Sequence, residues 1–411
     1  MKGSPRSWQL IEPPHGGRFA ALEGYRAAAA LGVLVFHSAF ATGIVRPDVI
    51  GGTVMDNLGG FCVAVFFVMS GFLLYRPMCA RILDGEPLPS RARFVVRRLV
   101  RIYPAYWLAL IGWAMVEPAL ATTRGNSWAI FLLFDPYVPP LPAFSGLSVA
   151  WTLSIEVAFY LMLVVIASVI AAASRRYVTL SARLGVQLAA LAALAAVGVV
   201  FIASAYSAGA TVPTYRWIFG YLDWFALGML LATVSLWVER DRNLPRSIQR
   251  LFDHGEWCLV LALACYLSVA ASTDGQFALS RTDTTSGVLF RHVVQGVGAS
   301  LALAPAVLGR VDQPVVRAMR WRPLTMLGVV SYGIYLWHNV VLSWLSQRWQ
   351  FDGRFTTFLI VTIVTILITL VFAVASHRFV EVPASGLARR SLRRPIRARS
   401  RSVRDPAAQA G

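Results

Sequence analysis

Apolar segments about as long as a lipid bilayer is thick recur along the whole of this chain. A helix rises 1.5 Å per residue, so about 20 apolar residues cover the roughly 30 Å of hydrocarbon in a bilayer. Charged residues make up only 14% of the chain, whereas a soluble protein carries about 25%. The sequence therefore predicts an all-α polytopic membrane protein with about ten transmembrane helices. The predicted spans are 20–45, 57–76, 99–120, 149–172, 184–206, 216–237, 256–272, 288–308, 324–346 and 356–378.

The arginine and lysine residues are distributed unevenly between the loops. Ten spans place both termini on one side of the membrane, and that side then holds most of the 38 Lys and Arg residues. Cytoplasmic loops of membrane proteins carry such an excess of positive charge, so both termini are predicted to be cytoplasmic. The same placement accounts for the net charge of +18 without a nucleic-acid partner, which argues against nucleic-acid binding.

Three parts follow from this pattern. Residues 1–19 form a polar cytoplasmic segment, which is not expected to be a cleaved signal peptide because no small-residue cleavage site follows a short apolar core. Residues 20–383 form the membrane domain. Residues 384–411 form a basic cytoplasmic tail, predicted to be disordered and attracted to anionic lipid headgroups. Within the membrane domain, the proline-broken stretch 127–148 is predicted to be a loop, with a re-entrant loop as the alternative.

Two ionisable residues, Arg26 and His37, lie inside the first apolar segment. They are eleven residues apart, about 20° past three full helical turns, so both side chains project from one face at a separation of roughly 16 Å. A charged group costs at least ~2.5 kcal/mol in the middle of a membrane helix. Such residues usually face a protein interior or a wet cavity, which makes this face a candidate functional site.

Further titratable residues lie at similar predicted depths in other spans. His37, Glu156, Asp223 and His338 are each about 10 Å from the outer ends of four different helices. Imidazole titrates near neutrality and can act as a general base, while a carboxylate can orient it and stabilise its cation. This outer layer therefore favours proton transfer.

Arginines gather at the inner ends of the spans. Arg26 lies in the inner half of the membrane, Arg76 ends the second span, and Arg98 and Arg101 begin the third. Guanidinium groups bind phosphates and carboxylates bidentately, so this inner layer suits an anionic ligand. An anion site below a proton-transfer site fits the transfer of a chemical group at the membrane.

Structural roles are the alternative for each of these residues. A membrane histidine can simply hydrogen-bond a neighbouring helix, and Glu156 can pair with an arginine or a serine. Asp223 can be a partner of Arg216 or of a tyrosine. The arginines of the third span can be ordinary positive-inside anchors, and Ser70 can serve close helix packing. No histidines, carboxylates or cysteines show the spacing of a metal site, so no metal is expected.

Six motifs resemble, in order, those of the acyltransferase-3 family of bacterial integral-membrane O-acyltransferases. They are LEGYRAAAALGVLVFH from Leu22 to His37, FFVMSGFLLYR from Phe66 to Arg76, RRLVRIYPAYW from Arg97 to Trp107, WTLSIEVAFYL from Trp151 to Leu161, SYGIYLWH from Ser331 to His338, and HRFVEVP from His377 to Pro383. One such motif is weak by itself, whereas the ordered series covers nearly the whole membrane region.

The resemblance implies a cytoplasmic acyl-CoA donor, with no permanently bound cofactor, and a hydroxyl acceptor on a cell-surface glycan or glycosylated metabolite. It implies an enzyme of the bacterial cytoplasmic membrane, in which His37 is the central catalytic residue. Glu156 and His338 match motif positions and are assigned to the catalytic group. The assigned donor-binding residues are Arg26, Ser70, Arg76, Arg98 and Arg101.

Two chemical routes and one rival function remain compatible with the sequence. His37 can deprotonate the acceptor hydroxyl for direct attack on the thioester, or it can carry the acyl group itself. The rival is a proton-coupled transporter or flippase for a glycan or lipid intermediate, since buried ionisable residues also mark such carriers. The absence of an inverted sequence repeat argues against this rival.

Overall fold

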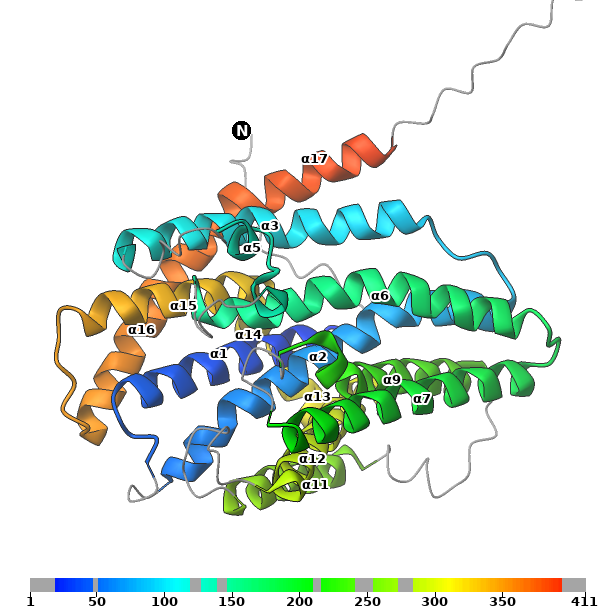
Figure 1. Ribbon diagram of the computed structural model, residues 1–411, viewed down its shortest axis with the longest axis horizontal. Helices are drawn as coiled ribbons and strands as arrows, with labels where there is room; N and C mark the ends of the chain where they lie inside the picture. The colour runs from blue at the N-terminus through cyan, green and yellow to red at the C-terminus, as the bar shows by residue number, and fades with distance from the viewer. Residues whose placement is uncertain are drawn as a thin grey trace, which may run out of the picture.

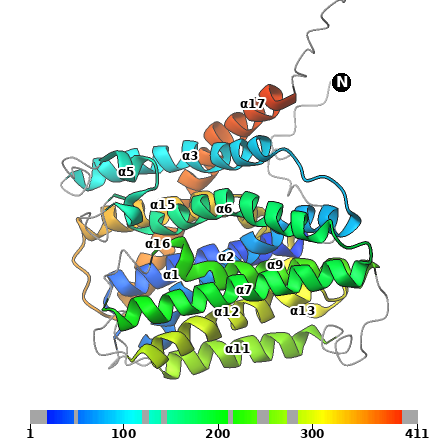
Figure 2. The same cartoon turned by 45° about the vertical axis from the view of Figure 1, so that its right-hand side comes forward.

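The computed structural model describes residues 19–46, 51–118, 127–138, 146–209, 216–240, 254–272 and 284–393. All regular structure within these ranges is helical, which confirms the predicted fold class. Figures 1 and 2 show the helices stacked in successive layers. From top to bottom in both views, α17 and α3 come first, then α15 and α6, then α1 and α2, and finally α12 and α11.

Within these described ranges, eight helical segments are long and apolar enough to cross a membrane. They are Ala21–Ala41 (α1), Gly52–Asp84 (α2), Arg91–Val116 (α3), Ser148–Ser174 (η3 and α6), Leu180–Ser207 (α7), Ile218–Arg240 (η4 and α9), Thr285–Val307 (α12) and Phe355–Ser391 (α16, η5 and most of α17). Helices α14 (Arg322–Val329) and α15 (Ser331–Ser346) form a pair bent by 70°, which makes a ninth span if counted as one. Helix α11 (Gly255–Ala271) is apolar but only 17 residues long.

Every predicted span therefore coincides with a helix or with the bent pair, whereas the number of ten remains a prediction. One prediction about the tail is wrong. Residues 384–393, expected to be disordered, continue the helix α17 (Val382–Arg393). Helix α17 packs along α3 and buries Ala388, and this tertiary contact supports a helix that the basic sequence alone did not indicate. The remainder of the tail lies outside the described residues.

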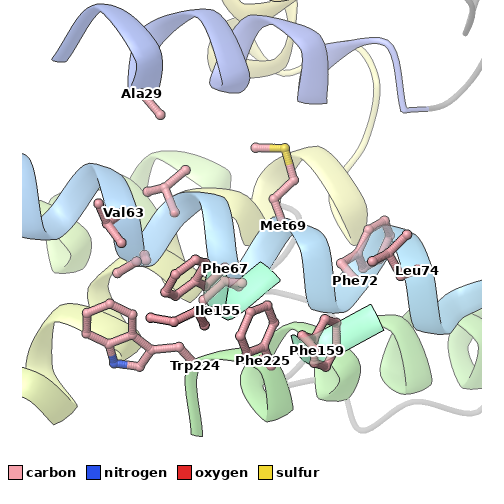
Figure 3. Packing of buried hydrophobic residues seen from close by; sticks show 14 of the residues in the cluster. Ala29, Val63, Phe67, Met69, Phe72, Leu74, Ile155, Phe159, Trp224 and Phe225 are labelled. Carbon is pink, nitrogen blue, oxygen red and sulfur yellow. The ribbon is translucent and has the colours of Figure 1, made fainter. Parts of the chain in front are cut away.

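Helices α2 and α9 approach closely through two glycines. A Cβ atom on Gly228 would lie 1.9 Å from the carbonyl oxygen of Val68, and one on Gly71 would lie 2.3 Å from that of Phe225. Small residues allow membrane helices this proximity. Figure 3 shows the aromatic core beside the contact, where the rings of Phe159 and Phe225 stack 3.8 Å apart. In the second-span motif, Gly71 is thus the small residue that allows the close packing of two helices.

Residues 127–138, in the connection between α3 and α6, pack back against α3. They contain α5 (Ser127–Phe131) and the short turn η2 (Asp135–Tyr137), and residues 119–126 and 139–145 of the connection lie outside the described residues. Three side chains of α3 donate hydrogen bonds to consecutive carbonyl groups of this stretch. The bonds run from Tyr106 to Ile130 at 2.6 Å, from Trp107 to Phe131 at 3.0 Å, and from Tyr103 to Leu132 at 2.8 Å. These bonds satisfy backbone acceptors that lie beside membrane helices.

Candidate active site

A cavity of about 110 Å³ lies between α1, α2, α3, α6 and α15. Five of the predicted site residues line it, namely Arg26, Ser70, Arg98, Arg101 and Glu156. Three tyrosines that sequence reasoning had not singled out, Tyr160, Tyr332 and Tyr335, also line it. Tyr160 follows Glu156 by four residues, a spacing that places both on one helical face and could have revealed it.

Glu156 lies among the arginines and not beside the histidines. Its Oε1 atom accepts a hydrogen bond of 2.7 Å from the hydroxyl of Ser70. This contact joins α6 to α2 and fixes the carboxylate at the cavity wall. The sequence grouped Glu156 with His37 by depth; in the structure Glu156 lines the cavity, and His37 and His338 are not among its lining residues.

The cavity arginines are only partly balanced by carboxylates. Arg26 lies 3.6 Å from Glu23 on the same helix. Within the described ranges, Arg98 and Arg101 form no ion pair, and the Arg98 guanidinium lies 5.7 Å from the ring centre of Phe94. The site thus holds three guanidinium groups, those of Arg26, Arg98 and Arg101, and only two nearby carboxylates, those of Glu23 and Glu156. Positive charge is therefore in excess, and the site can accept an anionic ligand.

His37 and His338 form a pair on α1 and α15. Their Nδ1 atoms lie 2.9 Å and 3.0 Å from the carbonyl oxygens of Val33 and Ile334, respectively. A carbonyl oxygen only accepts, so each Nδ1 carries a proton. The Nε2 atom of His338 lies 3.3 Å from Nδ1 of His37 and accepts from it as well. The Nε2 atom of His37 consequently keeps its lone pair and is the basic atom of the pair.

Tyr335 lies next to both the arginine cavity and the histidine pair. Its ring lines the cavity and lies 5.9 Å from the ring of His338, centre to centre. Its hydroxyl bonds to the hydroxyl of Thr152 at 2.7 Å and donates to the carbonyl of Val149 at 3.0 Å. Arg26 and His37 were predicted to project from one face of α1; Arg26 lines the cavity, whereas His37 is not among the residues that line it.

Arg76 lies away from the cavity. Its guanidinium binds both carboxylate oxygens of Glu239 at 2.6 Å and 2.7 Å and the hydroxyl of Ser235 at 3.2 Å. It also lies 4.8 Å from the ring centre of Phe19. The prediction placed Arg76 with the donor-binding arginines because it ends a motif, but its contacts give it a role in joining α2 to α9.

Asp223 pairs with His292, a residue that the sequence analysis had left without a role. The carboxylate lies 3.0 Å from Nε2 of His292, and both side chains are buried. The indole of Trp224 stacks on the imidazole at 4.6 Å and donates to the carbonyl of His292 at 3.0 Å. Among the described residues, the hydrogen-bond partner of Asp223 is thus His292, and not Arg216 or a tyrosine as the sequence suggested. The two residues are 69 positions apart, so no sequence spacing could have linked them.

The comparison with known proteins identifies the class. Residues 19–376 match the acyltransferase domain family Acyl_transf_3, and the chain belongs to this family. It thus carries an acyltransferase-family domain, and with its series of apolar helices it is a multi-pass membrane protein. No solved structure matches it.

Three relatives illustrate the family. The "Putative peptidoglycan O-acetyltransferase YrhL" of Bacillus subtilis is 26% identical over 401 residues, which cover 91% of this chain and 56% of that protein. The "Putative membrane-bound transacylase BcsY" of Komagataeibacter xylinus is 26% identical over 366 residues, covering 84% and 81%. A "Putative O-acetyltransferase" of Staphylococcus aureus is 24% identical over 383 residues, covering 88% and 56%. The chain thus spans just over half the length of the Bacillus and Staphylococcus relatives.

Proposed function

We propose that this protein transfers an acyl group from cytoplasmic acyl-CoA to a hydroxyl group of a carbohydrate-containing acceptor. The observation that carries the proposal is that Tyr335 lines the arginine cavity and also lies 5.9 Å, ring centre to ring centre, from His338, the partner of His37. The cavity supplies a site for an anionic donor, and the imidazole supplies a proton acceptor. Acyl-CoA is a substrate in this scheme, and no resident cofactor is involved.

The donor end of the scheme rests on Arg26, Arg98 and Arg101. Coenzyme A carries phosphate groups, which guanidinium groups bind with charge-assisted, bidentate hydrogen bonds. Arg98 and Arg101 belong to the basic first half of α3, which the distribution of positive charge assigns to the cytoplasmic side. With its phosphates there, the thioester arm extends along the cavity toward Tyr335.

The chemistry uses one atom of His37. Its Nε2 takes the proton of the acceptor hydroxyl, and the oxygen attacks the thioester carbonyl. The carbon–sulfur bond breaks, an ester forms, and the proton passes from Nε2 to the departing thiolate. In the covalent alternative, the same lone pair attacks the thioester carbonyl and the carbon–sulfur bond breaks, which releases the thiolate. The acceptor oxygen then takes the acyl group from Nε2, and the hydroxyl proton passes to the thiolate.

His338 is a positioning residue in this scheme. By accepting from Nδ1 of His37 it fixes the tautomer that leaves Nε2 free. The same hydrogen bond strengthens when His37 becomes a cation. Glu156, bonded to Ser70, tempers the positive charge of the cavity and orients the arginines that surround it.

The names of the relatives support an acetyl group and a glycan as the substrates. YrhL is named for peptidoglycan, which displays sugar hydroxyls outside the cytoplasmic membrane. We infer that this chain acts in the bacterial cytoplasmic membrane, with both termini in the cytoplasm, on a cell-envelope glycan or a glycosylated metabolite.

The test uses purified protein in lipid nanodiscs with acetyl-CoA and peptidoglycan fragments from lysozyme-digested bacterial sacculi. Free thiol is measured colorimetrically, and the fragments are analysed by mass spectrometry. Thiol release matched by acetylated fragments is the expected result. Transport of fragments into liposomes without thiol release would instead establish the carrier function.

A further inference from the structure

A second cluster of polar and aromatic side chains lies against α6 (Trp151–Ser174), on the side opposite the arginine cavity. Ser154 and Glu156 are two residues apart, about 200° around the helix, so they point in different directions. Glu156 faces the cavity, whereas the hydroxyl of Ser154 donates to Asp135 at 3.0 Å. Beside this contact, the guanidinium of Arg216 lies 5.2 Å from the ring centre of Trp151.

The backbone that carries Asp135 is held in a strained conformation. Leu133 has a φ angle of 59°, a left-handed conformation that costs a non-glycine residue roughly 1–2 kcal/mol. The amide of Phe134 reaches back to the carbonyl of Ala129 at 2.6 Å, which closes the end of α5. The hydrogen bonds from α3 to the preceding carbonyls stabilise this turn and thereby fix the direction in which the chain enters η2 (Asp135–Tyr137).

Aromatic side chains tie η2 to the start of η4 (Ile218–Tyr221). The indole of Trp217 donates to the carbonyl of Pro136 at 2.9 Å, and the hydroxyl of Tyr137 accepts from the amide of Ile218 at 3.2 Å. The rings of Tyr137 and Trp217 lie 5.9 Å apart. These rings and that of Trp151 are half-buried, so each keeps an accessible surface.

This combination of groups suits a sugar ring. A pyranose presents C–H groups on its faces and hydroxyls at its edge, so it stacks on aromatic rings and hydrogen-bonds to planar charged groups. Burial raises the pKa of Asp135 to about 6, although the hydrogen bond from Ser154 opposes this shift. At neutral pH the carboxylate is therefore mostly ionised and accepts, while the guanidinium of Arg216 donates. A few convergent polar groups among aromatic walls are typical of small-molecule sites.

The cluster is also connected to the histidine pair. Arg216 lies close enough to Asp135 and Tyr335 to interact with both electrostatically. Ser148, at the beginning of η3 (Ser148–Ala150), donates to Asn339 at 3.3 Å, and Asn339 directly follows His338. Tyr335 thus lines the arginine cavity and also lies near Arg216 of this cluster.

We propose that Asp135 and Arg216, with the rings of Trp151, Tyr137 and Trp217, form the subsite that binds the carbohydrate ring of the acceptor. The inference rests on the proposed function, since it gives the acceptor a place distinct from the donor cavity. The donor then binds in the arginine cavity and the acceptor in this subsite, so each can bind while the other is present.

The kinetic test compares Asp135→Asn and Arg216→Lys with the wild-type protein, using acetyl-CoA and lysozyme-released peptidoglycan fragments. The asparagine still accepts from Ser154, so the turn is preserved. Losing a hydrogen bond to a charged group is expected to raise the acceptor KM about ten- to a hundredfold, with the donor KM unchanged. Asp352→Asn is the matched control, because this carboxylate is exposed on the α15–α16 connection and pairs with Arg354.

A binding measurement separates this inference from the proposed function. Equilibrium dialysis with tritiated chitotetraose, an N-acetylglucosamine oligomer, needs no turnover. Binding by the wild-type protein that falls at least tenfold in Asp135→Asn supports the subsite even if no acyl transfer is detected, which would refute only the proposed function. The subsite is overturned if an active wild-type protein and Asp135→Asn share the same acceptor KM, if donor and acceptor KM rise together, or if wild-type protein does not bind chitotetraose.

Discussion

Two sides of the same helix bundle use the same kinds of ionisable residue in different ways. On the side of α1, α3, α6 and α15, Arg98 and Arg101 face a cavity without an ion pair in the described chain, and His37 keeps a free lone pair. On the side of α2, α9 and α12, such groups have dedicated partners. These pairs are Arg76 with Glu239, Arg240 with Asp84, and His292 with Asp223.

The difference teaches that the partner, and not the residue type or depth, decides whether a membrane charge is available to a ligand. Arg76 and Arg98 both belong to family motifs and both lie near the inner ends of predicted spans. A carboxylate already occupies the bidentate face of Arg76, whereas the guanidinium of Arg98 opens into the cavity. The variants below are arranged to break or sharpen this contrast.

The largest effect is expected for His37→Ala. Removing the proton acceptor should lower the rate of acyl transfer about 10²- to 10⁴-fold, because general-base catalysis contributes that much. His292→Ala is the paired variant, and the folded fraction of this protein should keep its kcat. Both rates are measured in nanodiscs after matching the amount of monodisperse protein. Similar losses of acyl-transfer rate in the two variants would show that the two histidine pairs do not differ in function.

Next in size is the loss of donor affinity in Arg98→Ala and Arg101→Ala. Each change removes a charge-assisted contact with phosphate and should raise the KM for acetyl-CoA about tenfold or more. The neighbouring Arg97 is exposed and does not line the cavity, so Arg97→Ala serves as the control. An equal rise in all three variants would mean that general surface charge, and not the cavity, attracts the donor.

A smaller effect, on stability, is expected for Asp223→Asn. This change weakens a buried pair and should destabilise the folded protein by roughly 1–3 kcal/mol. Thermal unfolding in detergent, followed by near-ultraviolet circular dichroism, reports the loss. The kcat of protein that remains folded should not change. A variant of normal stability with a reduced kcat would assign this pair to the chemistry instead.

The smallest effect is expected for Arg76→Ala. Its ion pair with Glu239 is partly exposed, and such pairs contribute about 0–1 kcal/mol. The KM for acetyl-CoA should match that of the wild-type protein, in contrast to Arg98→Ala. A tenfold rise would restore Arg76 to the donor site, where the sequence had placed it.

Much of the fold is predictable from sequence because membrane helices are determined locally. Apolar length alone located a helix for every predicted span, since each backbone group must be satisfied within its own segment. The 70° bend between α14 and α15 was not predictable. Beside it, Gly328 packs so closely on α1 that a Cβ atom would lie 2.1 Å from the carbonyl of Glu23, and this contact depends on a distant part of the chain.

Part of the candidate site was predictable in its members, but its pairings were not. Residue type and depth selected Arg26 and Glu156, which line the cavity, and also His37, which is not among its lining residues. The contact between His37 and His338 joins residues 301 positions apart, and periodicity cannot report such a distance. The same reason explains why Glu156 was grouped with histidines and why the partner of Asp223 was missed.

The most direct test of the central claim is a cryo-electron microscopy structure with a non-hydrolysable acetyl-CoA analogue bound. The account predicts phosphate density at Arg98 and Arg101, and the acyl end beyond Tyr335 within hydrogen-bonding reach of Nε2 of His37. Phosphate density at Arg76, or an acyl end directed away from His37, would contradict it.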